Sequence, residues 1–253
     1  MKFNKFNATI MLALALLLGA FTASAFAGST LEKVKKAGVI SVGNSPDYPP
    51  FESIGDTGER IGFDVDLLNA ITEKLGVKIN WVTMEFAAIV TAVQSGQVDM
   101  GMSGFSVTPE RANAVSFSKP YIASGQVLVV RTDSDISSPA DLKGKKIAVQ
   151  LGTTGEQQAD KIEGASVVKP ETYNIAFMML HNKAADAVVA DLSVAEEFVK
   201  KGTFKRAGEP LSFEEFAMIS RKGNDDLLNA LNKALEEVKK DGTYDAIVKK
   251  WGL

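Results

Sequence analysis

Residues 62–82 read GFDVDLLNAITEKLGVKINWV and set the pattern that decides the fold. From Val65 to Leu75 the apolar residues recur at helical spacing, and Gly76 is a typical helix stop. Residues 77–82 then alternate apolar and polar positions, as a β-strand does. A helix that passes directly into a strand is a building unit of α/β folds.

The same alternation of short strands and helices extends over most of the chain. It predicts an α/β fold with parallel sheets and helices on both faces. The tail departs from it, because a strand near 216–220 is followed by two helices. Residues 121–125 and 208–214 are the segments most suited to link domains. Further strands are predicted at 39–43, 98–101, 127–130, 147–149, 167–168 and 187–189, and further helices at 87–93, from 154, and at 175–180, 225–240 and 243–250.

Residues 1–27 have the features of a signal peptide. Lys2 and Lys5 precede the apolar run 10–21, and Ala25-Phe26-Ala27 gives the small-x-small pattern of a cleavage site. A membrane anchor is the alternative, but it needs roughly 18 or more apolar residues and this run is shorter. We therefore expect cleavage after Ala27, or else after Ala25, and export of a soluble chain to the periplasm.

The composition excludes several classes of function. The chain has 28 basic and 31 acidic residues, and this negative balance argues against binding to nucleic acid or to anionic lipid headgroups. It contains no cysteine, which excludes a disulfide framework, thiolate chemistry and a lipid-modified N-terminal cysteine. The only histidine, His181, lies at the polar end of a predicted helix, where a solvated side chain is the simplest explanation. No Ser/His/Asp or Cys/His set can therefore be assembled.

Metal and cofactor motifs are also weak. Asp64 and Asp66 form an isolated Asp-x-Asp pair, which solvated acids at a helix N-terminus explain better than a metal site. Residues 101–104 do not match a dinucleotide fingerprint, and no phosphate-binding loop occurs. We expect no metal, no cofactor and no enzymatic activity.

Thr108-Pro109-Glu110-Arg111 has the pattern of a helix start. Thr108 is a good N-cap, and Pro109 suits the first helical position. The motif follows a predicted strand closely, and ligands of open α/β sheets gather at the carboxyl ends of strands. Arg111 could there present its planar guanidinium to a carboxylate. The alternative is an exposed helix arginine.

Three further features lie beside predicted strands. Asp191 follows the strand 187–190, and it either caps the next helix or faces a ligand. The run 150–155 joins a strand to a helix, whose first backbone N–H groups favour an anion. Tyr48 and Phe86 are either core residues or the aromatic walls of a pocket.

Eight motifs follow one another in order: Tyr48-Pro-Pro-Phe51-Glu52, Gly62-Phe-Asp-Val-Asp-Leu67, Ser103-Gly-Phe-Ser-Val-Thr-Pro-Glu-Arg111, Phe117-Ser-Lys-Pro-Tyr121, Leu142-Lys-Gly-Lys145, Gly152-Thr-Thr154, Ala185-Asp-Ala-Val-Val-Ala-Asp191, and Asp241-Gly-Thr-Tyr-Asp245 near Trp251. Together they resemble the periplasmic solute-binding proteins of ABC transporters, in the branch that binds polar amino acids, family 3 of the bacterial solute-binding proteins. The resemblance covers residues 39–251, essentially the whole mature chain, and the order of the motifs makes it specific.

This resemblance implies a two-lobed α/β fold of the type II periplasmic-binding-protein kind. Each lobe is expected to hold a mixed, mostly parallel sheet flanked by helices, with two crossing strands as a hinge. Lobe 1 is expected at 28–121 plus 214–253, and lobe 2 at 122–213.

The resemblance also implies a role for each candidate residue. The residue that matches Arg111 binds the ligand α-carboxylate, helped by the backbone N–H of Thr154. The α-ammonium meets Asp191, the carbonyl of Gly104 and the hydroxyl of Ser106. The remaining contacts are two aromatic walls and a residue that helps to set specificity. The expected ligand-binding residues are Tyr48, Phe86, Gly104, Ser106, Arg111, Gln150, Thr154 and Asp191.

Two positions depart from the family's pattern and bear on the ligand. Ser45 and Ala87 stand where the family often has acidic residues that hold cationic or amide side chains. A buried cation without a counter-charge is costly, so the ligand is expected to be a neutral polar amino acid. Whether Asp47 or Glu85 enters the pocket cannot be read from the sequence.

The expected role is to capture an amino acid by hinge closure and to deliver it to an ABC permease in the inner membrane. The protein is expected to be a monomer without nucleic-acid partners or membrane insertion. Two alternatives remain: an exported amino-acid dehydratase on the same scaffold, and a ligand-sensing protein that reports to a membrane receptor.

Overall fold

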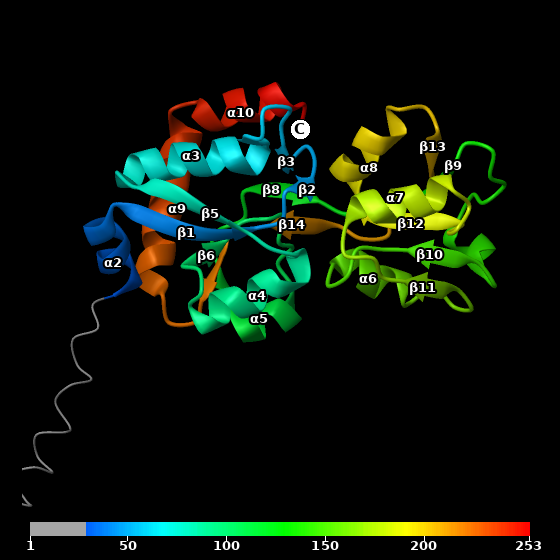
Figure 1. Ribbon diagram of the computed structural model, residues 1–253, viewed down its shortest axis with the longest axis horizontal. Helices are drawn as coiled ribbons and strands as arrows, with labels where there is room; N and C mark the ends of the chain where they lie inside the picture. The colour runs from blue at the N-terminus through cyan, green and yellow to red at the C-terminus, as the bar shows by residue number, and fades with distance from the viewer. Residues whose placement is uncertain (1–28) are drawn as a thin grey trace, which may run out of the picture.

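The computed structural model describes residues 29–253, so the predicted signal peptide lies outside the described residues. Two five-stranded sheets lie side by side along the long axis of the molecule, each with helices above and below it (Figure 1). The fold is a two-lobed α/β fold, as the sequence predicts. We call the half with the N-terminal strand lobe 1 and the other half lobe 2.

The sheet of lobe 1 has the order β5-β1-β6-β15-β7. Only β15 runs against its neighbours, so the sheet is mixed but mostly parallel in direction. Helices α3 and α10 lie above the strands and α4 and α5 below them (Figure 1). The elements are β1 (Val39–Asn44), β5 (Lys78–Thr83), β6 (Met100–Gly101), β7 (Val115–Phe117), β15 (Ile219–Arg221), α2 (Thr30–Ala37), α3 (Phe63–Leu75), α4 (Phe86–Ser95), α5 (Pro109–Ala114), α9 (Asp225–Lys240) and α10 (Thr243–Trp251).

The sheet of lobe 2 repeats this arrangement, with the order β11-β10-β12-β9-β13 and only β9 reversed. Helices α7 and α8 cover one face, and α6 lies on the other (Figure 1). The elements are β9 (Gln126–Arg131), β10 (Lys146–Ala148), β11 (Ser166–Val168), β12 (Ala187–Asp191), β13 (Phe204–Ala207), the short 3-10 helix η1 (Pro139–Leu142), α6 (Thr154–Ala159), α7 (Tyr173–His181) and α8 (Leu192–Val199).

The lobes are joined by two strands, β8 (Ile122–Ser124) and β14 (Glu214–Phe216), which pair antiparallel. The strand predicted near 216–220 is in fact two strands, because β14 belongs to this connection and β15 to the sheet of lobe 1. A small sheet that the sequence did not predict, β2 (Asp47–Tyr48), β3 (Glu52–Ile54) and β4 (Arg60–Ile61), lies beside the cleft.

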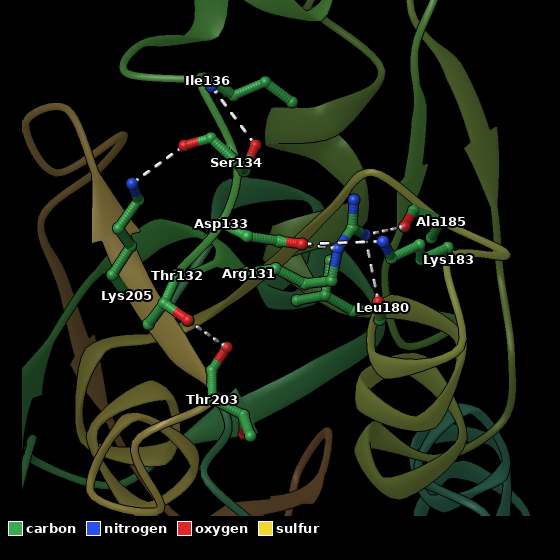
Figure 2. A network of polar contacts seen from close by, with 10 residues as sticks. All are labelled: Arg131, Thr132, Asp133, Ser134, Ile136, Leu180, Lys183, Ala185, Thr203 and Lys205. Carbon is green, nitrogen blue, oxygen red and sulfur yellow. Dashed lines mark hydrogen bonds and ion pairs between the residues drawn. The ribbon is translucent and has the colours of Figure 1, made fainter.

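A half-buried arginine, Arg131, fixes the far end of lobe 2 (Figure 2). The Arg131 guanidinium, at the end of β9, donates to the carbonyls of Leu180 and Ala185, both at 3.1 Å, and to Asp133 at 3.3 Å. Lys183 lies 3.6 Å from the other oxygen of Asp133. Leu180 lies in the last turn of helix α7, and a cation at a helix C-terminus satisfies carbonyls that lack intrahelical donors. The contact therefore ties α7 to the sheet, and α7 begins beside the candidate site.

Candidate functional site

A cavity with about 280 Å³ of empty space, part of it open to solvent, lies between the lobes. Seven of the eight predicted ligand-binding residues line it, and Asp191 lies behind it. The complete lining is Ser45, Asp47, Tyr48, Phe86, Ser103, Gly104, Ser106 and Arg111 from lobe 1, and Gln150, Thr153 and Thr154 from lobe 2.

Arg111 projects into this cavity from the first turn of α5. The predicted cap is present, since Thr108 accepts a hydrogen bond from the Arg111 backbone N–H and Pro109 occupies the first position. The guanidinium lies 5.4 Å above the Phe86 ring and 5.5 Å from the Phe105 ring, within range of a cation–π interaction. Burial lowers the pKa of Arg111, against the opposing effect of Asp191, but an arginine stays charged. The alternative of an exposed helix arginine is therefore wrong.

The same guanidinium connects the two lobes. Its Nη1 donates to the carbonyl of Ser106 at 3.0 Å, and its Nη2 donates to the carbonyl of Gly152 in lobe 2, also at 3.0 Å. The Ser106 and Thr154 hydroxyl oxygens lie 3.4 Å apart across the cleft. Arg111 and Ser106 thus contact lobe 2 at the edge of the cavity.

Gly104 lies in the turn between β6 and α5. Its φ of +61° is in the left-handed region, and a Cβ atom here would lie 2.6 Å from the Tyr48 ring. Only glycine fits this position without strain and collision. The Tyr48 ring in turn packs between the rings of Phe51 and of Tyr173 in lobe 2, with ring centroids 5.3 Å and 5.5 Å away. Its hydroxyl is buried without a hydrogen-bond partner among the described residues. The turn and this ring form one wall of the cavity.

Asp191 ends β12 and is only 4 % exposed. It occupies the N-cap position of α8, but its side chain makes no capping bond. Instead it accepts hydrogen bonds from Gln126 at 2.7 Å and from the Tyr173 hydroxyl at 3.1 Å. The capping alternative is therefore wrong. Burial raises the pKa of Asp191 to about 7, and the hydroxyls of Tyr48 and Tyr173 and the charge of Arg111 oppose that rise.

Thr154 opens helix α6 beside Asp191. Its hydroxyl donates to Glu214 at 2.6 Å and accepts from Gln126 at 3.1 Å. As the first residue of the helix it also carries a backbone N–H without an intrahelical acceptor. Glu214 belongs to β14, so this hydroxyl links lobe 2 to the connection between the lobes.

Asp47 is a lining residue that the sequence left undecided. One carboxylate oxygen accepts from the Ser45 hydroxyl at 2.8 Å, and the other accepts from Gln150 and from the Tyr173 backbone N–H, both at 3.3 Å. Burial raises its pKa. The cavity therefore contains a carboxylate after all, and the argument for a neutral ligand from Ser45 and Ala87 loses its premise.

Glu85 does not line the cavity. It lies in an adjoining depression with Ala87, Leu151 and Glu171. Its pKa is raised by burial and by repulsion from Glu171 and Asp47. The side of the cleft next to Asp47 is therefore acidic on both lobes.

The sequence analysis treated the lining residue Ser45 only as a departure from the family's pattern, and it assigned no role to Ser103 or Thr153. Ser103 and Thr153 are small polar residues inside the quoted motifs, and this position was the only signal for them. One assignment was wrong: Asp64 is fully buried rather than solvated. Within residues 29–253, no group of three or more side chains could hold a metal ion. No helix in that range has the length and apolar character needed to cross a membrane.

Residues 40–253 match the model of the bacterial extracellular solute-binding proteins, family 3. A probable histidine-binding protein of Campylobacter jejuni is 36% identical over 222 residues, which are 85% of each chain. The L-cystine-binding protein TcyJ of Escherichia coli is 34% identical over 95% of this chain and 92% of its own. An arginine-binding protein of the same organism is 34% identical over 95% of this chain and 98% of its own.

Solved structures agree with these matches. An ancestral arginine-binding protein bound to arginine is 45% identical, with a TM-score of 0.82 over 85% of this chain and 98% of its own. The same ancestral protein bound to glutamine is equally similar. A mutant ArgBP from T. maritima is 40% identical, with a TM-score of 0.85 over 88% of this chain and 98% of its own. The ancestral amino acid-binding protein AncCDT-1, a precursor of cyclohexadienyl dehydratase, is 39% identical, with a TM-score of 0.84 over 88% of this chain and 99% of its own.

Proposed function

The chain belongs to family 3 of the bacterial extracellular solute-binding proteins, and we propose that it captures an amino acid with a cationic side chain, arginine first, since relatives of the chain are named as amino-acid-binding proteins. The observation that carries this proposal is one cavity between the lobes that contains both Arg111 and Asp47. A ligand with a carboxylate at one end and a guanidinium or ammonium at the other has a partner for each charge.

The α-carboxylate is assigned to Arg111. A guanidinium forms two parallel hydrogen bonds to a carboxylate, and such charge-assisted pairs are about twice as strong as neutral hydrogen bonds. Stacking on Phe86 and Phe105 restricts the guanidinium before the ligand arrives. The backbone N–H of Thr154 adds a donor from lobe 2.

The α-ammonium is assigned to Asp191, Ser106 and the carbonyl of Gly104. A zwitterion that leaves water must regain hydrogen bonds at both poles. Asp191 supplies the opposite charge, and Gln126 and Tyr173 hold its carboxylate in place. Ser106 is at the cavity wall and already approaches Thr154 across the cleft.

The side-chain cation is assigned to Asp47. Gln150 donates to the same carboxylate and so positions it from lobe 2. Glu85 and Glu171 lie just outside and add negative potential at this end. The relatives support a ligand of this class, since several of them are named as arginine-binding proteins.

Delivery follows from the family. We propose that a signal peptide at 1–27 exports the protein to the periplasm, and that a monomer closes on its ligand and releases it to an ABC permease. The proposed lobes are 28–121 plus 214–253 and 122–213, with 121–125 and 208–214 bending as they close.

Calorimetry with the purified protein tests the ligand. Arginine is expected to bind most tightly, followed by lysine, with glutamine weaker. Asp47→Asn is expected to remove the preference for a cation, whereas Glu85→Gln changes it less because Glu85 lies outside the cavity. Tighter binding of glutamine or cystine than of arginine would overturn the cationic assignment and favour a neutral ligand.

An enzymatic role is the second candidate, and one observation favours it. A buried carboxyl whose pKa lies near 7, as at Asp191, suits a general acid. The similarity to AncCDT-1 concerns a binding protein that preceded a dehydratase. Incubation with amino acids and with cyclic dienyl carboxylic acids, followed by product analysis, separates the two functions. Turnover would replace the binding assignment, and unchanged ligand would support it.

A further inference from the structure

Two acidic side chains lie buried behind the wall of the cavity, and the proposed binding mechanism does not use them. Glu52 is on β3 and Asp64 is in the first turn of α3, and both are 0 % exposed. Neither lines the cavity. Two carboxylates that lose all contact with water are costly unless their oxygens are bonded and their charge is reduced.

Each carboxyl group uses one oxygen to hold the turn at residues 103–104. Glu52 Oε1 accepts from the Ser103 hydroxyl at 2.5 Å, and that hydroxyl accepts from the Ser45 backbone N–H at 3.1 Å. Asp64 Oδ2 accepts from the Gly104 backbone N–H at 3.2 Å and from the Tyr121 hydroxyl at 2.8 Å. The turn that forms the cavity wall is therefore held from behind at two successive residues.

The other oxygen of each group, Glu52 Oε2 and Asp64 Oδ1, is buried without a donor. The two carboxyl groups lie close together, because they bond neighbouring residues of one turn, Ser103 and Gly104, and each affects the pKa of the other. Two carboxylates cannot bond to one another without a proton, because ionised carboxyl groups only accept. A single proton between these two oxygens satisfies both atoms and removes one of the two buried charges.

The groups of the described residues that act most strongly on the two carboxyls are acidic or neutral. Asp47 and Tyr48 face Glu52 from β2, and Tyr121 faces Asp64 from the start of the connecting strands. Arg60 is a cation close enough for the charge of Glu52 to affect its pKa, but its guanidinium bonds Asn44 and Thr83 and lies 5.1 Å from the Trp81 ring centroid.

We propose that Glu52 carries a proton and donates it to Asp64, and that this acid pair positions the Ser103–Gly104 turn for the ligand ammonium. The assignment of the proton to Glu52 follows from the donors, because Asp64 accepts two hydrogen bonds at its other oxygen and is the better carboxylate. The link to the ammonium rests on the function proposed above. Glu52 and Asp64 are positioning residues, since neither touches the ligand.

The titration of both groups agrees with a shared proton. Burial and repulsion from Asp64 raise the pKa of Glu52 well above its ordinary value of 4.5, and burial raises the pKa of Asp64 to about 7. A carboxyl whose pKa is raised on folding stabilises the protein below its unfolded pKa. That stability is lost as the pH rises from about 4.5 towards the folded value.

Thermal unfolding of ligand-free protein between about pH 5 and about pH 8 tests the pair without any ligand. Glu52→Gln keeps an acceptor for Ser103 and a donor for Asp64 and cannot lose a proton. Its melting temperature relative to wild type is therefore expected to rise steadily with pH. Glu73→Gln, on an exposed part of α3, removes one carboxylate away from the pair and is the matched control.

The shared proton would be overturned if the melting temperature of Glu52→Gln relative to wild type changed with pH no more than that of Glu73→Gln. Should Glu52→Gln fail to fold, Asp64→Asn gives the same comparison, because its amide can donate to an ionised Glu52. The rise with pH is expected for it as well, and its absence counts equally against the pair.

Arginine binding tests the positioning role. Glu52→Ala leaves the Ser103 hydroxyl without its acceptor and Asp64 Oδ1 without its proposed donor, so affinity should fall about tenfold or more in a folded protein. Glu52→Gln should restore it. Equal affinity of the two variants would contradict positioning. If wild type bound no arginine, the ligand assignment would fail, but the melting experiment would still decide whether the proton is shared.

Discussion

The two lobes have the same order of strands, yet they contribute differently to the cavity between them. Lobe 1 supplies the guanidinium of Arg111, the rings of Tyr48 and Phe86, and the carboxylate of Asp47. Lobe 2 supplies an amide and two hydroxyls, with Asp191 behind them. Lobe 1 therefore holds most of the groups that can bind a ligand strongly. In the proposed mechanism the groups of lobe 2 reach the ligand only when the cleft closes, so lobe 2 variants should report on closure as well as on affinity.

Loss of the planar guanidinium of Arg111 should have the largest effect on ligand affinity. Arg111→Lys keeps the charge but loses two parallel hydrogen bonds and the stacking on Phe86. Loss of a buried charged contact costs about 2–5 kcal/mol, a fall in affinity of tens to thousands of fold. Calorimetry on the folded variant measures it. Unchanged affinity would show that the strong contacts are not in lobe 1.

The second effect concerns selectivity within lobe 1. Asp47→Asn removes the counter-charge for the side chain and should weaken arginine binding by about 1.5–3 kcal/mol, or roughly tenfold to a hundredfold. Glutamine affinity should change little, because an amide can pair with asparagine. Calorimetry with both ligands checks this. If arginine and glutamine lost affinity equally, the side chain of the ligand would not lie against Asp47.

The third effect belongs to Asp191 in lobe 2 and depends on pH. Burial raises its pKa to about 7 in the free protein, so below that pH it is protonated. Binding of an ammonium requires the carboxylate, and the proton must then leave. Affinity should be constant above about pH 7 and fall by up to about tenfold per pH unit below it.

Asp191→Asn is the control for this pH dependence. It should bind more weakly at neutral pH and lose most of the fall in affinity below pH 7, because no proton has to leave. Calorimetry in buffers with different heats of ionisation detects the released proton directly. A variant that keeps the full fall would assign the titration to another group, such as Asp64.

The smallest effect is expected at Thr154. Thr154→Val keeps the size but removes the hydroxyl that bonds Glu214, at a cost of about 1 kcal/mol, or several-fold in affinity. Thr154→Ser keeps the hydroxyl and should bind like wild type. Equal weakening by both variants would assign the loss to packing instead of the hydrogen bond.

The sequence predicts those parts of the site that depend on neighbouring residues. The Thr108 cap, the Pro109 start and the Gly76 stop are local interactions, and each occurs as predicted. Strand and helix periodicity likewise located most of the longer elements. It missed α2, β7, β8, β13 and the small sheet, and the strand predicted near 216–220 divides because its two halves pair with partners in different sheets.

The orientation of buried acids could not be read in the same way. Asp191 turns away from its helix because Gln126 and Tyr173, distant in sequence, offer donors. Asp47 faces the cavity because Gln150 holds it from the other lobe. Asp64 resembles a solvated helix N-terminal acid by pattern, and only the fold brings Tyr121 onto it. These outcomes depend on long-range contacts between side chains, which spacing along the chain does not encode.

The central claim is that the ligand bridges the two lobes, and the distance between the lobes tests it most directly. The chain contains no cysteine, so Lys78→Cys in lobe 1 and Glu163→Cys in lobe 2, both exposed, can carry a donor and an acceptor fluorophore. Saturating arginine should increase energy transfer in this protein. It should increase transfer less when Asp191→Ala is added, because a contact from lobe 2 is lost. Unchanged transfer with arginine tightly bound would contradict the bridging mechanism.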